Sequence, residues 1–308
     1  MAHNECVAVL GYGAQGRAIA LNLRDCGWRV TVGLRPRSRS RAVARKDKIA
    51  AADLLTAAAN ADIIIVALPD HRHKVVLNTG FWAGLRGRPA VVFLHGSSIH
   101  FGLVKPPMDL PVLLLAPHAP GTAVRENFLA KRPFSAFSAV QQGRRAAGER
   151  LIARLAKGIG IPKSHLVPTT FTDEAVGDLF GEQAVLCGGL ARLLKLGFET
   201  LVEAGLPPRN AYLEVAYQID LIVALIKQHG LEGMFARISP LAKYGSATAG
   251  PKVIDDRVRE AMKQALDDIV SGRFISRAEK AKVNPTSKQM KRLTNALFDR
   301  QVRAYKKR

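Results

Sequence analysis

Residues 7–16 read Val7-Ala8-Val9-Leu10-Gly11-Tyr12-Gly13-Ala14-Gln15-Gly16, a short apolar run that leads into three spaced glycines. The run has the length and composition of a buried strand, and residues 16–26 have the periodicity of a helix. In such a strand–turn–helix unit the first glycine permits a tight turn, the second lets a ligand approach the backbone, and the third lets helix and strand pack closely. The stretch therefore predicts a Rossmann-type turn, with the pyrophosphate of a dinucleotide bound at the start of the helix. The residues expected there are Gly11, Tyr12, Gly13, Ala14, Gln15 and Gly16.

The same alternation continues along the first half of the chain. Further apolar runs lie at 30–32, 63–68, 91–94 and 112–115, with helical stretches between them such as 51–58. Another strand is expected near 135–140, followed by a helix over 143–157. Fully apolar strands separated by helices are typical of a parallel sheet covered on both faces. We therefore predict an α/β N-terminal Rossmann domain.

The segment after the second strand indicates which dinucleotide is bound. Sites for NAD usually end this strand with Asp or Glu, which holds the ribose hydroxyls. Here the strand runs into Arg35-Pro36-Arg37-Ser38-Arg39-Ser40-Arg41, which contains no carboxylate. Guanidinium and hydroxyl groups suit a 2′-phosphate. The sequence therefore favours NADPH over NADH.

The second half of the chain has a different pattern. Residues 173–205, 208–228 and 255–271 have apolar positions three and four apart, and no strand-like run interrupts them. We predict two domains: residues 1–168 form the NADP-binding Rossmann domain. Residues 169–308 form an all-α domain that ends in a basic tail.

Composition narrows the class of protein. The chain has 308 residues and a formal charge of +21, and twelve Lys or Arg lie between Gly272 and Arg308. This basic tail permits polyanion binding, or is simply a solvated surface, but no nucleic-acid-binding motif accompanies it. No apolar run approaches the roughly 18 residues of a membrane span, and no signal peptide is evident. Three scattered cysteines fit free thiols in the cytoplasm.

Two pairs of polar side chains stand out in the apolar helices of the second half. Asp178 and Glu182 are four residues apart, as are Glu214 and Gln218, so each pair shares a helix face. Oxygen ligands of this kind bind Mg²⁺, although surface salt bridges would give the same spacing. His71 and His73, by contrast, are interpreted as polar surface residues after Asp70.

Several segments together resemble the ketol-acid reductoisomerases, also called acetohydroxyacid isomeroreductases. The matching segments are the turn 11–16, then Leu68-Pro69-Asp70, His95-Gly96, residues 178–189, residues 197–205 and Gly250-Pro251. The resemblance implies an NADPH- and Mg²⁺-dependent enzyme of branched-chain amino acid biosynthesis. Such enzymes isomerise a 2-acetohydroxyacid by alkyl migration and then reduce the resulting 2-keto acid.

The resemblance also implies roles for individual residues. Asp178 and Glu182 match the first pair of metal ligands, and Glu214 with the position of Gln218 matches the second. His95 matches an active-site histidine and Ser239 a substrate-contacting serine. The cofactor-phosphate region is matched by Gln15, Arg35, Ser38 and Ser40. The family's helical domain forms an interlocked dimer in which the positions of Glu214 and Ser239 reach the partner's site, so a homodimer or larger assembly is implied.

This sequence departs from the family pattern at the metal and substrate positions. Gln218 replaces a glutamate, and His118 replaces a lysine in the segment Ala116-Pro117-His118. Neighbouring departures are Gly177 for Thr, Tyr217 for His, Asp220 for Lys and Pro240 for Asn. A neutral amide binds Mg²⁺ less strongly than a carboxylate, and His is mostly uncharged at pH 7. Both changes weaken the two-metal centre, and His118 is a catalytic candidate because it lies where the family places a charged group.

Three functions remain open from the sequence. The first is a reductoisomerase that acts on 2-acetohydroxyacids or related 2-keto acids. The second is a diverged paralogue that reduces a 2-keto acid without isomerisation. The third, from another class, is a non-catalytic NADPH-binding protein whose basic tail binds a polyanion.

Overall fold

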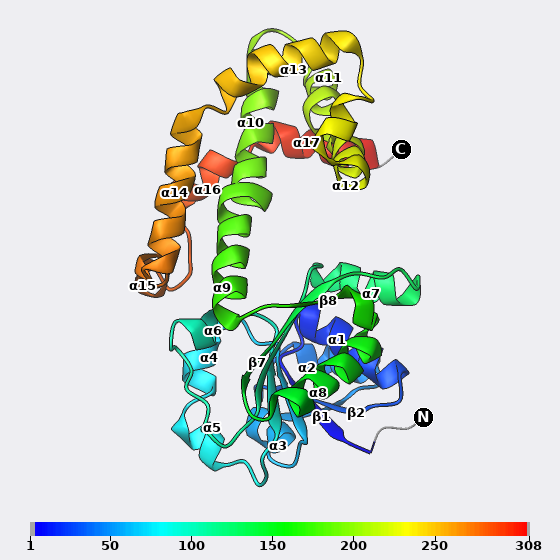
Figure 1. Cartoon of the computed structure of the whole chain (residues 1–308), viewed down its shortest axis with the longest axis vertical. Helices are drawn as coiled ribbons and strands as arrows, with labels where there is room; N and C mark the ends of the chain where they lie inside the picture. The colour runs from blue at the N-terminus through cyan, green and yellow to red at the C-terminus, as the bar shows by residue number, and fades with distance from the viewer. Residues whose placement is uncertain (1–3, 307–308) are drawn as a thin grey trace. The chain divides into compact units, whose positions relative to one another are not determined.

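The structure, a computed structural model, describes residues 4–306 (Figure 1). The chain divides into two compact units, Met1–Gly177 and Asp178–Arg308. We call them the N-terminal unit and the helical unit.

The N-terminal unit is built on one sheet, which has eight strands among the described residues. Its strands lie in the order β3-β2-β1-β4-β5-β6-β7-β8. Their bounds are β1 Cys6–Leu10, β2 Arg29–Leu34, β3 Ala50–Asp53, β4 Ile63–Val66, β5 Ala90–Phe93, β6 Val112–Pro117, β7 Ala136–Gln142 and β8 Leu166–Pro168. Neighbouring strands from β3 to β6 pair in parallel. The predicted α/β Rossmann architecture is confirmed.

Two strands depart from a fully parallel sheet. β7 pairs with β6 antiparallel, and β8 pairs in parallel with β7. The residues of β7 are mostly half-buried, whereas β4 and β5 are buried throughout. Fully apolar runs predict parallel central strands, and that inference does not extend to a half-exposed strand such as β7.

The prediction of a helix over residues 51–58 was wrong for its first part. Ala50–Asp53 form β3, and α3 spans only Leu54–Ala58. Three consecutive alanines favour a helix by local propensity, but β3 pairs with the exposed edge of β2, from Thr31–Ala50 to Leu34–Asp53. Tertiary pairing overrides the weak local preference.

Helices cover both faces of the sheet. They are α1 Ala14–Asp25, α2 Ser40–Lys46, α4 Asp70–Val76, α5 Thr79–Ala83, α6 Ser97–His100, α7 Gly121–Leu129 and α8 Arg145–Ile159, in addition to α3. One buried cluster joins Val7, Val9 and Ile65 to α1 and α8. A second joins Ala8 and Leu10 to α3 and α5. Because successive strand residues point to opposite faces, the central strands β1, β4, β5 and β6 contribute to both clusters.

The helical unit contains no strand among its described residues. The chain enters it through α9 Phe171–Phe180, which begins in the N-terminal unit. Its other elements are the π-helical segment η2 Gly181–Leu186, α10 Gly188–Glu203, α11 Pro208–Tyr212, the π-helical segment η3 Leu213–Tyr217, α12 Ile219–Phe235, α13 Pro240–Val253, α14 Asp256–Val270, α15 Arg273–Lys280, α16 Ser287–Leu293 and α17 Ala296–Lys306. The predicted all-α second half is confirmed.

The basic tail forms ordered helices that pack on the helical unit. Phe298 of α17 lies against Phe198 of α10, with ring centres 5.3 Å apart. Asp268 pairs with Arg273 and Arg277 at 2.7 and 2.5 Å. Two positive charges of the tail are therefore paired with a carboxylate of the same unit. No helix in residues 4–306 is long and apolar enough to cross a membrane.

Candidate cofactor and active site

The three glycines of the turn after β1 have three different environments. Gly11 has φ +99°, and a Cβ there would lie 2.6 Å from the carbonyl oxygen of Ala67. A Cβ on Gly16 would lie 2.4 Å from the carbonyl oxygen of Gly11, whereas one on Gly13 would meet no protein atom within 4 Å. The protein itself thus requires Gly11 and Gly16, while Gly13 keeps space open beside the backbone. This arrangement fits a pyrophosphate.

The start of α1 offers backbone N–H groups to that open space. α1 begins at Ala14, and Gly13 before it provides no side-chain cap. The loop after β6 packs against this turn, because a Cβ on Gly121 would lie only 2.3 Å from the backbone nitrogen of Gln15. The Gln15 amide reaches the carbonyl oxygen of Ala119 at 3.5 Å. An uncapped N-terminus of this kind attracts anions.

The loop between β2 and α2 carries the predicted 2′-phosphate ligands. Arg35 is exposed and Ser38 and Ser40 are half-buried, and the Ser38 hydroxyl accepts the N–H of Ser40 at 3.3 Å. Arg41 folds back on the protein: it donates to the carbonyl oxygens of Leu34 and Arg35 and pairs with Asp53. Arg35 is thus free to face solvent and ligands, while Arg41 stabilises the loop.

His95 lies between two carboxylates in the N-terminal unit. Its Nδ1 is 3.5 Å from Asp70 and its Nε2 is 3.9 Å from Glu174. Burial tends to raise the pKa of Asp70, but the hydrogen bond with His95 and the charge of that residue outweigh it, so the pKa is lowered. Glu174 is buried and accepts the N–H of Gly96 at 2.5 Å. The group is therefore a histidine with an ionised partner on one side and a buried acid on the other.

His73 is buried, so its interpretation as a surface residue was wrong. Only 3% of it is exposed, and its Nε2 lies 2.9 Å from the carbonyl oxygen of Leu68. Its Nδ1 lies 2.7 Å from the hydroxyl of Ser98. A carbonyl can only accept, so Nε2 carries the proton and Ser98 donates to Nδ1. Burial lowers the pKa of His73 and keeps it neutral.

His118 is exposed, on the loop that packs against the start of α1. Its Nδ1 lies 2.9 Å from the hydroxyl of Ser135, and its ring stands edge-on to Phe137 with centres 4.3 Å apart. These contacts fix the ring beside the β6–α7 loop.

The four predicted metal ligands lie in or beside the two π-helical segments. Asp178 is in α9, Glu182 in η2 and Glu214 in η3, while Gln218 follows η3 directly. Gln218 donates its amide to Glu214 at 3.4 Å, so this pair does share a face. A Cβ on Gly188 or Gly189 would lie 2.1 Å from a carbonyl oxygen of η2, so these glycines leave room for the wider turn. In residues 4–306 no three His, Cys, Asp or Glu side chains gather closely enough to hold a metal ion.

Ser239 caps α13. Its hydroxyl accepts the N–H of Ala242 at 3.2 Å, and Pro240 occupies the first helical position. Proline is favoured there because that N–H would have no partner within the helix. The departure at residue 240 is therefore compatible with the local structure.

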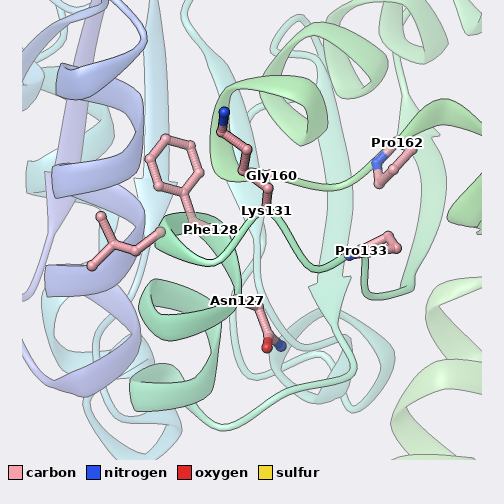
Figure 2. Close-up of a pocket in the computed structure, with 7 residues that line it drawn as sticks. Asn127, Phe128, Lys131, Pro133, Gly160 and Pro162 are labelled. Atoms are coloured by element: carbon pink, nitrogen blue, oxygen red, sulfur yellow. The ribbon is translucent and has the colours of Figure 1, made fainter.

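A hollow of about 450 Å³ lies elsewhere on the N-terminal unit (Figure 2). It is lined by Asn127, Phe128, Leu129, Lys131, Pro133, Gly160 and Pro162. None of these is a predicted site residue, so the hollow is separate from the glycine turn and from His95.

Family models match both halves of the chain. Residues 1–164 match the model of the acetohydroxy acid isomeroreductase NADPH-binding domain, and residues 171–307 match the ketol-acid reductoisomerase C-terminal domain. The chain belongs to the ketol-acid reductoisomerase family. It is thus an enzyme of the reductoisomerase class, and the non-catalytic alternative is not favoured.

Relatives of this reductoisomerase support the assignment along most of its length. It is 44% identical to the NADP(+) ketol-acid reductoisomerase of Pyrobaculum neutrophilum, over 92% of this chain and 88% of the relative. It is 44% identical to that of Pyrobaculum aerophilum, over 87% and 82%. A solved NADH-preferring ketol-acid reductoisomerase from an uncultured archean has a TM-score of 0.91 and 32% identity, covering 99% of this chain and 94% of that one.

Two residues beside His95 were not predicted as site residues from the sequence. Asp70 and Glu174 flank His95, although they lie 25 residues before it and 79 residues after it in the chain. Glu174 precedes Asp178 by four residues, as Asp178 precedes Glu182, and this longer i, i+4 series was an available signal. Asp70 follows β4 as His95 follows β5, and adjacent parallel strands bring such residues to one edge.

Proposed function

We propose that this protein is an NADPH- and Mg²⁺-dependent ketol-acid reductoisomerase that acts on 2-acetohydroxyacids. The observation that carries the proposal is the glycine turn with its open space at Gly13, in a chain so similar to named NADP(+) reductoisomerases. NADPH supplies the hydride when bound, and Mg²⁺ polarises substrate oxygens. The corresponding role is in branched-chain amino acid biosynthesis in the cytoplasm. The domain boundary is proposed to lie between residues 168 and 169.

The preference for NADPH rests on the loop between β2 and α2. Arg35 and the hydroxyls of Ser38 and Ser40 would hold the 2′-phosphate, because no carboxylate ends β2. One solved relative is named NADH-preferring, so family membership alone does not decide this point. A charge-assisted hydrogen bond contributes about 1.5–3 kcal/mol, so we expect NADPH to bind about tenfold to a hundredfold more tightly than NADH.

His95 is the residue we assign to proton transfer. Asp70 faces Nδ1 and holds the proton there, and its negative charge stabilises the imidazolium form. Nε2 is buried beside the Glu174 carboxylate, 3.9 Å away, so we propose that the proton moves between His95 and that carboxylate. His118, beside the start of α1, is proposed to contact the substrate end of the cofactor site, and Ser239 to contact substrate.

The metal ligands are assigned to Asp178, Glu182 and Glu214, with Gln218 as a weak fourth. The Gln218 amide donates to Glu214, so it stabilises that carboxylate but adds no charge of its own. The missing charge is the reason to test isomerisation and reduction separately.

A homodimer is part of the proposal. In the single chain, α12 exposes Leu221, Ile222, Val223 and Leu231, and α13 exposes Leu241 and Tyr244. Apolar surface of this extent on a soluble protein marks an interaction site. Glu214, which lies just before α12, is accordingly proposed to complete the site of the partner subunit.

The deciding experiment follows NADPH oxidation by purified protein with Mg²⁺. It compares 2-acetolactate with 3-hydroxy-3-methyl-2-oxobutanoate, which needs no isomerisation. We expect both to turn over. Turnover of the second alone would establish the reductase alternative, and turnover of neither, with NADPH bound, would refute the proposed substrates.

A further inference from the structure

Asp47 joins three segments of the N-terminal unit. It follows α2 directly, and its side chain is only 11% exposed. Its Oδ2 accepts the hydroxyl of Tyr12 at 2.9 Å and the Nε of Arg17 at 2.6 Å. A second bond from Arg17 reaches Oδ1 at 2.8 Å, which makes the pair bidentate.

One partner of Asp47 belongs to the predicted pyrophosphate site, and the others lie on the helix that follows it. Tyr12 lies between Gly11 and Gly13 in the turn, with only 5% of its surface exposed. Arg17 is in the first turns of α1. Arg24, further along α1, donates to the backbone carbonyl oxygen of Asp47. Both the side chain and the backbone at the end of α2 are therefore bound to the turn and to α1.

The protonation states suit these hydrogen bonds. The bond from Arg17 lowers the pKa of Asp47 against the opposing effect of burial, and Tyr12 lowers it further. Burial, and then contact with Asp47, raise the pKa of Tyr12. At neutral pH Asp47 is thus an ionised acceptor and Tyr12 a protonated donor.

α2 is the weakly held member of this group. It has seven residues, of which only Ala44 is buried, whereas α1 buries seven of its twelve. The turn is also held independently, because Gly11 donates its N–H to the carbonyl oxygen of Gly33 at 3.0 Å. Arg41 holds the first turn of α2, so loss of the Asp47 carboxylate is expected to loosen α2 from its other end rather than α1 or the turn.

We propose that Asp47 is a positioning residue for cofactor choice. It holds the loop that carries Arg35 and Ser38 at a fixed position relative to the pyrophosphate turn. The inference rests on the proposed NADPH function. α2 begins at Ser40 and continues directly from the loop with Arg35 and Ser38, so its position sets theirs. NADPH and NADH share the pyrophosphate contacts, and only NADPH has a 2′-phosphate. Releasing α2 therefore weakens NADPH binding selectively.

The test measures the dissociation constants of NADPH and NADH by titration calorimetry, on the full chain, for wild type and Asp47→Asn. We expect the ratio of NADH to NADPH constants to fall about tenfold or more in the variant, since about one charged hydrogen bond to the 2′-phosphate is lost. Asp109→Asn is the matched control. Asp109 is half exposed and pairs with Arg88, a residue outside the Asp47 group. Its ratio should stay within about twofold of wild type.

Each result decides the matter. An unchanged ratio in Asp47→Asn, or an equal loss for both dinucleotides, overturns the positioning role. Wild-type protein that binds neither dinucleotide refutes the proposed cofactor itself, which is a separate failure. If Asp47→Asn does not fold, Tyr12→Phe and Arg17→Gln each remove part of the contact. Their ratios must then fall while that of Asp109→Asn stays unchanged, and constant ratios would overturn the proposal.

Discussion

The two units of this enzyme differ in how completely they bury their own apolar residues. The N-terminal unit has two large buried clusters, one on each face of its sheet. In the described part of the helical unit, only Phe198, Ala211, Met234 and Ile269 are buried hydrophobic residues. Burial of apolar surface is the main favourable contribution to folding. The N-terminal unit therefore has a complete core of its own, whereas the helical unit requires a further surface to cover it.

The candidate sites differ in the same way. In the N-terminal unit, contacts within the chain hold Asp47, Glu174 and His95 in place. In the helical unit, Asp178, Glu182 and Glu214 are all exposed in the single chain. The candidate residues of the first unit are thus held by contacts within the chain, whereas those of the second would be held in the proposed dimer.

The largest expected effect comes from placing a charge on the exposed apolar face of the helical unit. Leu221 is 60% exposed in the single chain. A charge buried in an apolar interface costs several kcal/mol, so Leu221→Asp should weaken self-association by about 100-fold or more. Sedimentation measures the association, and NADPH titration should show binding within about twofold of wild type.

The matched control places the same charge on the N-terminal unit. Met108 is 84% exposed there, and Met108→Asp should leave association and binding unchanged. If Leu221→Asp associates as wild type does, the exposed apolar face is not an interface. The small buried core of the helical unit would then not be explained by self-association.

A smaller effect should separate ligand space from packing space in the glycine turn. Gly13 has φ −75°, which any residue adopts, and open space beside it. Gly13→Ala should therefore leave the melting temperature nearly unchanged while it weakens NADPH binding about 30-fold, since its Cβ meets the pyrophosphate. Gly16→Ala should lower both the melting temperature and the affinity for NADPH, because its Cβ meets the backbone of Gly11. Equal melting losses in the two variants would show that the space at Gly13 is not reserved for cofactor.

Restoring a carboxylate at residue 218 should strengthen the metal site of the helical unit. Gln218→Glu adds a charged oxygen ligand beside Glu214, so the Mg²⁺ concentration for half-maximal turnover should fall about tenfold. Gln228→Glu, on the exposed surface of α12, makes the same charge change away from the motif and serves as control. A tenfold fall in both variants, or in neither, would mean that residue 218 is not a ligand.

The sequence predicted the N-terminal unit well where local pattern and tertiary structure agree. The glycine turn predicted β1 and α1 because close backbone contacts require Gly11 and Gly16, while Gly13 leaves space for a ligand. The prediction from sequence was wrong at β3, where a run of alanines forms an edge strand instead of a helix. It also missed the antiparallel direction of β7, which no local pattern shows.

The candidate site was less predictable because its contacts join distant segments. His73 looked like a surface residue beside His71, yet it is buried against Ser98, 25 residues away. The bond from Gln218 to Glu214 depends on side-chain geometry at the end of a π-helical segment. Resemblance to a family located these positions, and only the structure gave their partners.

The smallest expected effect is a pH dependence that belongs to the N-terminal unit. Burial lowers the pKa of His73 from its usual 6.5, against the opposing effects of Asp70 and the Leu68 carbonyl. As pH falls through about 6.5 the unfolded chain binds a proton at this residue while the folded protein does not. The free energy of unfolding therefore falls with pH, and His73 should contribute a loss of about 1 kcal/mol between pH 7 and pH 5.

His73→Gln should remove this contribution, because glutamine keeps a donor for Leu68 and an acceptor for Ser98 without a group that titrates. His71→Gln is the control, since His71 is exposed on the same helix. Urea unfolding at pH 5, 6 and 7 compares the three proteins through their midpoints. The slope with pH should be shallower in His73→Gln alone. A slope equal to that of wild type would show that His73 takes up its proton without unfolding, so that the N-terminal unit is less rigid at His95 than its contacts indicate.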